Sequence, residues 1–529
     1  MKTKHILLGL SLGLLGGFTA CDVTDLDPKD SITDNSYWNT VSDLENYAKG
    51  FYMNLTGKGL RSDGSENLDD LNALDERSDD RLVASPDQWL FNEWVIPSEA
   101  NFDSKWYWNN IRNLNYFMTR YQRVNATESE VNPVVAVIRF FRAFDYFDKI
   151  KTFGDVPWYE KDLTTADIDE LYKARDDRDF VLGKIIEDLE FAIEWLPEKS
   201  AAEVGALHKD AARTFLARVC LHYGTYKKYH NVSTSPTSQE LLQKAATLAK
   251  EVMDSGLYDI VQGSDAGANQ SAFADYPLYY ANQFTQEDLT TNKECILARV
   301  FEADVLTHNL ARSGGVGLSK DFAESFLCKD GLPIANSSEY KGDETLDDEM
   351  ANRDPRMYQI IDSKYRPYTV KSNGMRVVNS GIDDKKEFSP SEEPGTNVHS
   401  APGLTGTATG YSPIKLVSAS QSQQDAVKTS SYDWFVFRYA EILLIYAEAK
   451  CELGECTQAV LDETINKLRD RVEMKHLTVS PVADLNPVDY GYSITPLLYE
   501  IRRERRIELA LEGFRYDDIM RWNAMKLFE

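Results

Sequence analysis

The end of this 529-residue chain concentrates side chains that could do electrostatic chemistry. Residues 501–522 read IRRERRIELALEGFRYDDIMRW and hold six arginines: Arg502, Arg503, Arg505, Arg506, Arg515 and Arg521. Arginines at this density are typical of phosphate contacts in nucleic-acid-binding proteins. The whole chain nevertheless has 85 acidic against 58 basic residues and a formal net charge of -27, and such a field repels phosphate backbones.

The same stretch supplies its own counter-charges. Five carboxylates bring residues 501–522 close to neutrality: Glu504, Glu508, Glu512, Asp517 and Asp518. On a helix, Glu500 meets Arg503, and Arg505 meets Glu508, at the i, i+3 spacing. We therefore predict structural ion pairs and helix caps here, and no nucleic-acid partner.

Residue patterns of common enzymes are absent from the sequence. It contains no H-E-x-x-H, no G-x-S-x-G, no G-x-x-x-x-G-K-[ST] and no G-x-G-x-x-G. The histidines form no local ligand cluster, and the acidic stretch 67–81 lacks the alternating oxygens and glycine of a calcium loop. A carboxylate pair for glycoside hydrolysis stays open, although none can be named among 85 acidic residues. We expect no catalysis, no metal site and no cofactor.

The first twenty residues have the pattern of an export signal. Lys2 and Lys4 precede an apolar run from Ile6 to Phe18, which is shorter than the ~20 residues that span a bilayer. The run ends in F-T-A-C, which resembles a bacterial lipobox with Phe18 in place of the usual leucine. We predict that residues 1–20 are removed and that Cys21 carries a lipid. The alternative is an ordinary secretory signal followed by a chance cysteine.

The remaining cysteines number five, so a full disulfide framework is excluded. They are Cys220, Cys295, Cys328, Cys451 and Cys456. Cys220 and Cys451 lie in helical apolar patterns, which favours inert buried thiols. Cys451 and Cys456 flank a predicted turn, and a bond between them is the alternative.

Most of the mature chain has the apolar period of helices. The clearest case is 180–197, which Pro197 closes. Further helices are predicted at 43–55, 106–121, 134–150, 210–224, 238–256, 434–454, 456–471 and 496–513. Ala447, Gly454 and Ala459 have the spacing of a tetratricopeptide unit, in which two antiparallel helices approach closely.

Residues 257–433 differ in character, because Gly, Ser, Asn, Asp and Pro alternate there with short apolar runs. We predict a mainly α protein, a tetratricopeptide-like helical-hairpin array with one large irregular, loop-rich lobe. The expected divisions are a signal peptide at 1–20, helical parts at 21–256 and 434–529, and the lobe at 257–433. Excursions of this size on a helical scaffold usually carry binding.

Taken in order, eleven blocks of the chain resemble the SusD/RagB family. They include LDPKDSITDNSYWNTVSDLENYAKGFY (26–52), RFFRAFDYFDKIKTFGDVPW (139–158), NRDPRM (352–357), TGYSPIKL (409–416), RYAEILLIYAEAKCELGE (438–455), INKLRDR (465–471) and RRERRIELALEGFRYDDIMRW (502–522). The others are 106–118, 179–197, 209–224 and 326–334. The family usually continues past the final R-W pair, whereas this sequence stops at Glu529, so a truncated C-terminus is one expectation.

The resemblance implies a surface lipoprotein of the outer membrane. Such proteins capture a glycan and hand it to a SusC-like TonB-dependent transporter, without catalysis, and the closing arginine block is a helix that packs back on the array. Asp22, Asp25 and Asp27 resemble the signal that sends these lipoproteins to the cell face. Two alternatives stay open: a peptide-capturing member of the same family, and a surface glycoside hydrolase.

The family's ligand site lies on loops beside the array, partly after an early Ser-Asp motif. Sugars present apolar C–H faces to aromatic rings and hydroxyls to polar side chains. The resemblance therefore places ligand contacts in SDDRLVASPDQWLFNEW, at Asp80, Arg81, Trp89 and Trp94. The irregular lobe adds the aromatic segment YPLYYANQF, where Tyr279, Tyr280 and Asn282 are further candidates. Burial in a small core is the alternative for each aromatic residue, and Trp106 and Trp108 are predicted to be core.

Overall fold

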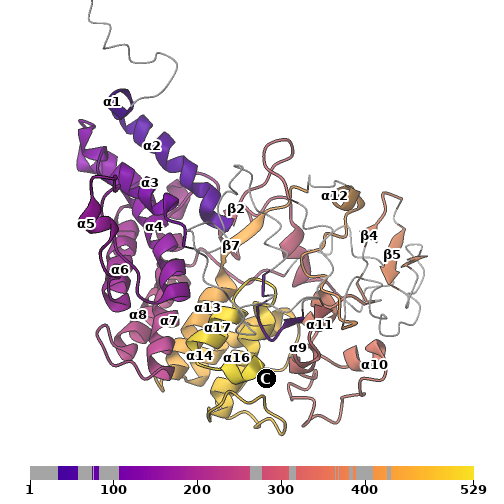
Figure 1. Ribbon diagram of the computed structural model, residues 1–529. Helices are drawn as coiled ribbons and strands as arrows, with labels where there is room; N and C mark the ends of the chain where they lie inside the picture. Colours follow the sequence, from indigo (N-terminus) through magenta and orange to yellow (C-terminus); the bar gives the residue numbers. More distant parts are fainter. Residues whose placement is uncertain are drawn as a thin grey trace, which may run out of the picture.

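The computed structural model describes residues 34–56, 74–75, 77–82, 106–262, 277–308, 317–363, 365–366, 369–373, 375–379, 385–388, 409–425 and 430–528. Its helices form an array on one side of the molecule, and the lobe lies on the other (Figure 1). The C-terminal helices lie between the two. This arrangement confirms the mainly α, helical-hairpin architecture with one irregular lobe.

The first part of the array contains the longest helices. These are α1 (Asp34–Tyr37), α2 (Val41–Lys49), α3 (Asn109–Met118), α4 (Glu128–Phe153), α5 (Ile168–Leu171), α6 (Arg178–Trp195), α7 (Lys209–Tyr229) and α8 (Ser238–Asp254). Consecutive long helices pack as hairpins, α4 on α6 and α7 on α8. None of the described helices is both long and apolar enough to cross a membrane.

Local sequence explains where these helices begin. Thr127 and Glu130 form a capping box at the start of α4, with the Thr127 amide donating to the Glu130 carboxylate at 2.9 Å. Thr237 and Glu240 cap α8 in the same way. In α7, a Cβ on Gly224 would lie 2.9 Å from Leu242 Cγ, so a glycine there lets α7 and α8 approach closely.

The last helices of the array come after the lobe in the sequence. They are α13 (Tyr439–Glu452), α14 (Gln458–Glu463), α15 (Ile465–Arg471), α16 (Pro496–Glu508) and α17 (Arg515–Arg521). Gly454 turns the chain between α13 and α14 with a φ of +74°, a conformation that favours glycine. The tetratricopeptide-like hairpin predicted from Ala447, Gly454 and Ala459 is therefore present.

Two of the predicted helices are not continuous helices in the structure. Residues 434–438 of the predicted helix 434–454 form a strand, because the aromatic, β-branched run WFVFR pairs with a second strand. The predicted helix 456–471 is broken at Thr464, whose φ is -128° and ψ -92°. The Thr464 hydroxyl donates to the Val460 carbonyl, a bond that competes with the backbone ladder.

In the described part of the lobe, the helices and strands are short. The helices are α9 (Lys320–Ser325), α10 (Leu346–Met350), α11 (Arg356–Ile360) and α12 (Gln421–Asp425). The strands form three small antiparallel sheets: β1 (Arg81–Leu82) with β3 (Gly317–Leu318), β2 (Cys295–Arg299) with β7 (Trp434–Arg438), and β4 (Thr369–Val370), β5 (Arg376–Asn379) and β6 (Lys385–Phe388).

Two apolar cores meet along α16 and the β2–β7 ribbon. Ile501 of α16 and Phe437 of β7 belong to the core of the array. Ile507 of α16 and Phe435 of β7 belong to the core of the lobe. Because single elements contribute to both cores, the lobe and the array are packed as one body around α16.

Candidate functional site

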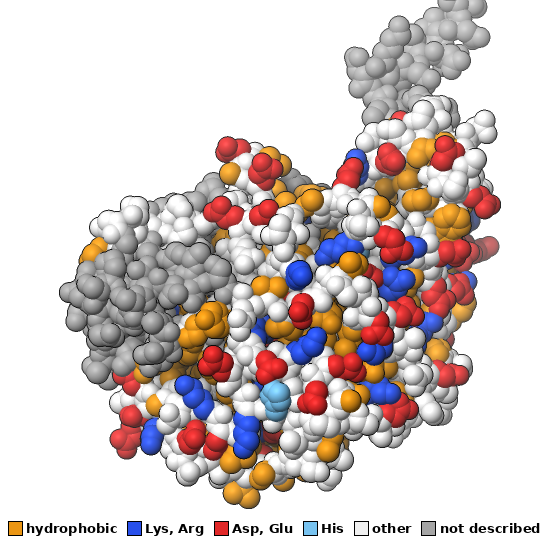
Figure 2. Space-filling view, turned by 180° about the vertical axis from the view of Figure 1, so that it is seen from behind, with side chains coloured by type: hydrophobic (Ala, Val, Ile, Leu, Met, Phe, Trp, Pro, Cys, Tyr) orange, Lys and Arg blue, Asp and Glu red, His pale blue; other side chains and the backbone are white. Residues whose placement is uncertain are grey.

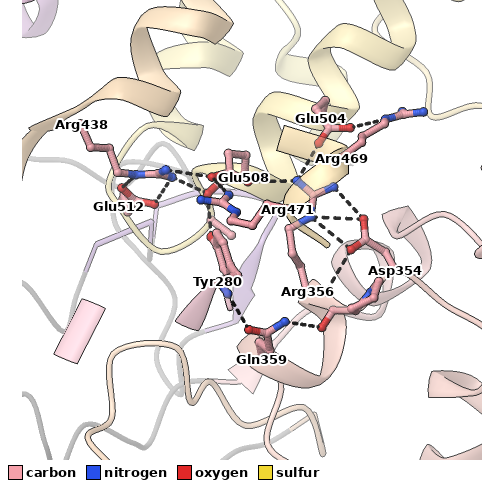
Figure 3. Close-up of polar contacts among 12 residues, drawn as sticks. Tyr280, Asp354, Arg356, Gln359, Arg438, Arg469, Arg471, Glu504, Glu508 and Glu512 are labelled. Carbon is pink, nitrogen blue, oxygen red and sulfur yellow. Dashed lines mark hydrogen bonds and ion pairs between the residues drawn. The ribbon is translucent and has the colours of Figure 1, made fainter. Parts of the chain in front are cut away.

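The inner face of α16 carries the strongest concentration of buried charge in the described chain. Glu508 has no exposed surface, and its carboxylate accepts from Arg356 at 3.0 Å, from Arg438 at 2.8 Å and from Arg471 (Figure 3). Burial by itself would raise the pKa of Glu508, but Arg471, Arg438 and Arg356 outweigh burial and hold that pKa well below its ordinary value. Glu508 is therefore an anion that joins three segments of the chain.

The neighbours of Glu508 extend this cluster on both sides. Glu504 accepts from Arg356 at 2.6 Å and from Arg469 at 2.9 Å. Glu512 accepts from Arg438 at 2.7 Å and from Lys415 at 2.5 Å. We call the following ten residues the α16 network: Glu504, Glu508, Glu512, Glu294, Asp354, Arg356, Arg438, Arg469, Arg471 and Lys415.

The α16 network contains five cations and five carboxylates, so its buried charges balance. Burial lowers the pKa of Lys415 to about 8, against the opposing pull of Glu512. Such a cluster is costly to desolvate but very sensitive to losing one partner. Its position between the two cores makes it the element that fixes the lobe on the array.

A second cluster joins α17 to α13. Arg521 donates to both oxygens of Glu448, at 2.6 and 2.7 Å, and the Trp522 indole donates to the same carboxylate at 2.8 Å. Asp518 accepts from Arg505 at 2.8 Å and from Arg521 at 2.9 Å. These bonds hold α17 and Trp522 against α13 at the end of the helical array.

A third cluster ties the early Ser-Asp segment to the C-terminal helices. Asp79 accepts two bonds of 2.7 Å from Arg515, and Asp80 accepts from Arg506 at 2.7 Å. Asp75 accepts from the backbone amides of Gly513 at 3.1 Å and Arg515 at 3.0 Å. Burial would raise the pKa of Asp79, but Arg506 and Arg515 lower it to about 2. Asp75, Asp79 and Asp80 thus hold the described residues of this segment against α16 and α17.

These contacts confirm the structural interpretation of the arginine run. All six arginines are buried and ion-paired, so they are not available to a phosphate backbone. On the face shown in Figure 2, acidic and basic side chains are interspersed and do not gather by sign. The predicted pair of Glu500 with Arg503 is present at 3.2 Å. The predicted pair of Arg505 with Glu508 is wrong, because each of the two is turned to partners on other elements.

The predicted ligand residues differ in burial and in their contacts. Tyr280 has no exposed surface, and its hydroxyl donates to the Glu508 backbone carbonyl at 2.6 Å (Figure 3). Asp80 is 2% exposed and bound to Arg506. Arg81 is buried, and its guanidinium donates to the Leu74 carbonyl at 2.7 Å. A buried ring cannot stack on a sugar from solvent, so the structure places Tyr280 as a structural residue, and it places Asp80 and Arg81 in the same way.

Tyr279 and Asn282 are half-buried at the edge of the lobe, where each keeps some exposed surface. Trp89, Trp94 and Cys21 lie outside the described residues. Trp106 and Trp108 are partly buried against the core of the array, as predicted. The structure therefore leaves Tyr279 and Asn282 as the described candidates for ligand contact.

Sequence reasoning missed the partners of the α16 network. Arg356, Lys415, Arg438, Arg469 and Arg471 come from the blocks NRDPRM, TGYSPIKL, RYAEIL and INKLRDR. Arg438 follows the apolar run WFVF, and Lys415 lies between Ile414 and Leu416. A cation in such a context signals burial with a counter-charge. That signal identifies the residues as buried, but not which carboxylates they meet.

The cysteines are unbonded among the described residues. Burial raises the pKa of Cys220 and of Cys295 to about 12. Both thiols are therefore inert, as predicted for Cys220. Cys451, predicted to be buried, is half-buried like Cys456, and no disulfide joins the two. Among the described residues there is also no group of three or more His, Cys, Asp or Glu arranged to hold a metal ion.

Two family models match the chain. Residues 263–527 match the SusD family, and residues 27–221 match a family described as starch-binding associating with outer membrane. SusD-like protein P2 of Formosa agariphila is 23% identical over 537 residues, covering 98% of this chain and 90% of that protein. SusD-like protein P38 of the same organism is 22% identical over 555 residues, covering 99% and 92%.

Solved structures show the same fold. A SusD-like protein from Bacteroides fragilis has a TM-score of 0.65 and 23% identity, covering 94% of this chain and 89% of that chain. A SusD-like carbohydrate binding protein from the same species has a TM-score of 0.65 and 23% identity, covering 92% and 87%. A structure with xylogluco-oligosaccharide has a TM-score of 0.54 and 18% identity, covering 90% and 82%. Since the first family model alone matches half of the sequence, at residues 263–527, this chain belongs to the SusD family.

Proposed function

We propose that the protein is a cell-surface lipoprotein that captures a glycan and delivers it, without catalysis, to a SusC-like TonB-dependent outer-membrane transporter. The observation that carries the proposal is the pair of family matches, which together extend over residues 27–221 and 263–527. One of the families is described as starch-binding and associating with the outer membrane. The similar fold that was solved with a xylogluco-oligosaccharide adds support at the level of ligand class.

The ligand contacts that we propose are Trp89, Trp94, Tyr279 and Asn282. Tyr279 lies beside Tyr280, whose hydroxyl is fixed on α16, so the backbone that presents Tyr279 is held in place. The segment with Trp89 and Trp94 follows Leu82 in sequence, and residues 79–80 are clamped by Arg506 and Arg515. A rigid scaffold of this kind reduces the entropy lost when aromatic side chains bind a ligand.

The glycan contacts can be tested with purified protein lacking residues 1–21. A glycan array and a peptide library identify the ligand class, and the variants Trp89→Ala, Trp94→Ala and Tyr279→Ala are then titrated with the best glycan. Losing a stacking ring should weaken binding by about 1–3 kcal/mol, by analogy with base–aromatic stacking. The matched control is Tyr172→Ala, which removes an 85%-exposed tyrosine on the array.

The outcomes separate the alternatives. Glycan binding that falls in the three variants and not in the control supports the proposal. Binding of peptides alone would establish the peptide-capturing alternative, and release of shorter products from a polysaccharide would establish a hydrolase.

Delivery to a transporter is tested in native membranes. After mild detergent extraction, a pull-down should recover a TonB-dependent receptor together with this protein. Recovery of the protein alone in several detergents would argue strongly against the partnership. The same membranes report exposure, since added protease should cut the protein on intact cells.

A further inference from the structure

A cavity of about 170 Å³ lies on the array, where residues of α4, α7, α13, α16 and α17 meet. Four aromatic rings line it: Phe144, Phe147, Phe215 and Phe514. A neighbouring cavity of about 150 Å³ shares Phe144 and Phe514 and adds Trp434. A cavity of ~150 Å³ is large enough to admit a six-membered ring. Each of these two cavities therefore has room for one ring, and aromatic walls suit the apolar face of that ring.

Two polar side chains in the first cavity have unused hydrogen-bonding capacity. Arg505 is 3% exposed; its Nε donates to Asp518, but its Nη1 is buried and has no hydrogen-bond partner among the described residues. Buried donors are normally paired, and an orphaned one indicates a missing acceptor.

His222 lines the same cavity and packs its ring edge-on against Phe147, 5.4 Å between centroids. Within the described chain, no hydrogen bond to its imidazole is found. Burial, with Lys151 and Arg521 nearby, lowers the pKa of His222 well below its ordinary value, so the ring is neutral at pH 7. A neutral imidazole offers one donor and one acceptor, which is the pattern that a hydroxyl group matches.

The charges around the cavity indicate a neutral ligand. Its four cations, Lys151, Arg218, Arg505 and Arg521, are matched by four carboxylates, Asp148, Glu512, Asp517 and Asp518. Most of these are already paired; Lys151, for example, contacts Asp517 at 2.6 Å, and Arg218 contacts Glu441 at 2.5 Å. An anion would gain little here, whereas a neutral polyhydroxylated ring needs the donors and the aromatic walls that are present.

We propose that this cavity, together with its neighbour, is a second sugar-binding site for two adjoining neutral pyranose rings, separate from the contacts at Tyr279 and Asn282. Arg505 Nη1 and the His222 ring bind hydroxyls of one pyranose ring, and Phe144 lies between the two subsites. The ligand class, though not the cavity, rests on the proposed glycan function. A site on the array would let the protein hold a long chain at two points, which raises avidity without a new contact at either point.

The test uses the histidine resonances of the signal-free protein. The sequence has seven histidines, and His5 is removed with the signal. A ¹H–¹³C spectrum of the ¹³C-histidine-labelled protein is therefore simple, and the spectrum of His222→Asn assigns the His222 signal. The probes are methyl pyranosides of glucose, galactose, mannose and xylose, with maltose and cellobiose, and glucuronate as the charged comparison. We expect a saturable shift of the His222 signal with at least one neutral sugar, with a disaccharide binding more tightly than its monosaccharide.

Two variants check that the shift comes from the cavity. Phe144→Trp fills the space shared by both subsites, and His222→Leu removes the donor and acceptor at similar size. Phe144→Trp should weaken the His222 response about tenfold, and His222→Leu, which has no His222 signal, should weaken sugar binding measured by saturation-transfer NMR by the same factor. A tenfold loss corresponds to about one hydrogen bond. His222→Asn keeps a donor and an acceptor, and should retain sugar binding measured by saturation-transfer NMR. Unchanged melting temperatures show that the variants are folded.

The result that would refute the second site is different from the result that would refute glycan capture. If a polysaccharide identified on the glycan array binds, but no neutral sugar shifts the His222 signal, then the second site does not exist and the proposal of glycan capture stands. If glucuronate binds here better than every neutral sugar, the assignment of a neutral ligand is overturned. Trp89→Ala and Trp94→Ala should weaken polysaccharide binding while leaving the His222 response intact.

Discussion

Replacing Glu508 by glutamine tests the role of the α16 network. The substitution keeps the size of the side chain and removes the charge that Arg356, Arg438 and Arg471 share. Five cations would then face four carboxylates in a region without solvent. Removing one partner from a buried ion pair typically costs 3–5 kcal/mol in free energy of unfolding, because it leaves a buried charge uncompensated.

The structure indicates the lower end of that range. Each of the three arginines keeps another carboxylate, since Arg356 contacts Asp354 at 2.7 Å, and both Arg438 and Arg471 contact Glu294, at 2.8 and 3.0 Å. We therefore expect Glu508→Gln to lower the free energy of unfolding by about 3 kcal/mol. The loss should appear in the lobe and the array together, because α16 contributes to both cores.

Urea unfolding at pH 7, followed by tryptophan fluorescence and by far-ultraviolet circular dichroism, measures this change. The matched control is Lys526→Met, which removes one partner of the exposed ion pair with Asp489 and should leave the midpoint unchanged. A loss below about 1 kcal/mol for Glu508→Gln, comparable to a typical surface ion pair, would refute the argument that the network fixes the lobe on the array.

The pH dependence adds an independent check. The pKa of Glu508 in the folded protein lies below the ordinary value of 4.5, so the unfolded chain holds this proton more tightly. The contribution of Glu508 to stability is therefore complete above about pH 4.5 and is lost as the pH falls. The difference in unfolding free energy between wild type and Glu508→Gln should shrink below that pH. A difference that stays constant down to pH 3 would contradict the assigned charge of Glu508.

Three further predictions address other parts of the chain. Burial lowers the pKa of His308 to about 4, so the protein should lose stability as the pH falls from 6.5 towards 4, and His308→Gln should flatten that loss in thermal melts; an unchanged slope would contradict it. Tyr280→Phe removes the 2.6 Å bond to the Glu508 carbonyl and should cost about 1 kcal/mol in urea unfolding while glycan affinity stays the same, whereas reduced affinity would restore Tyr280 as a ligand residue. Cys21→Ala should move the protein from the membrane to the soluble fraction of cells; a variant that still sediments with the membrane would disprove the lipid anchor.

The sequence by itself determined the helices, the irregular lobe, the family and the structural role of the six arginines. These follow from local patterns: apolar period, capping residues such as Thr127 and Glu130, and blocks in a fixed order. The near-neutral composition of residues 501–522 was enough to predict ion pairs. It was not enough to choose the partners.

Only the tertiary structure decided which charges meet. The i, i+3 rule joined Arg505 to Glu508, but Glu508 pairs with Arg356, which is 152 residues away in sequence, and Arg505 pairs with Asp518. Helical spacing specifies which residues share a face and not what lies opposite that face. The same reason explains Tyr280, whose ring the sequence offered as a stacking platform. Its burial depends on where η6 (Ala281–Thr285) and the end of α16 pack, and that packing is set by the lobe core as a whole.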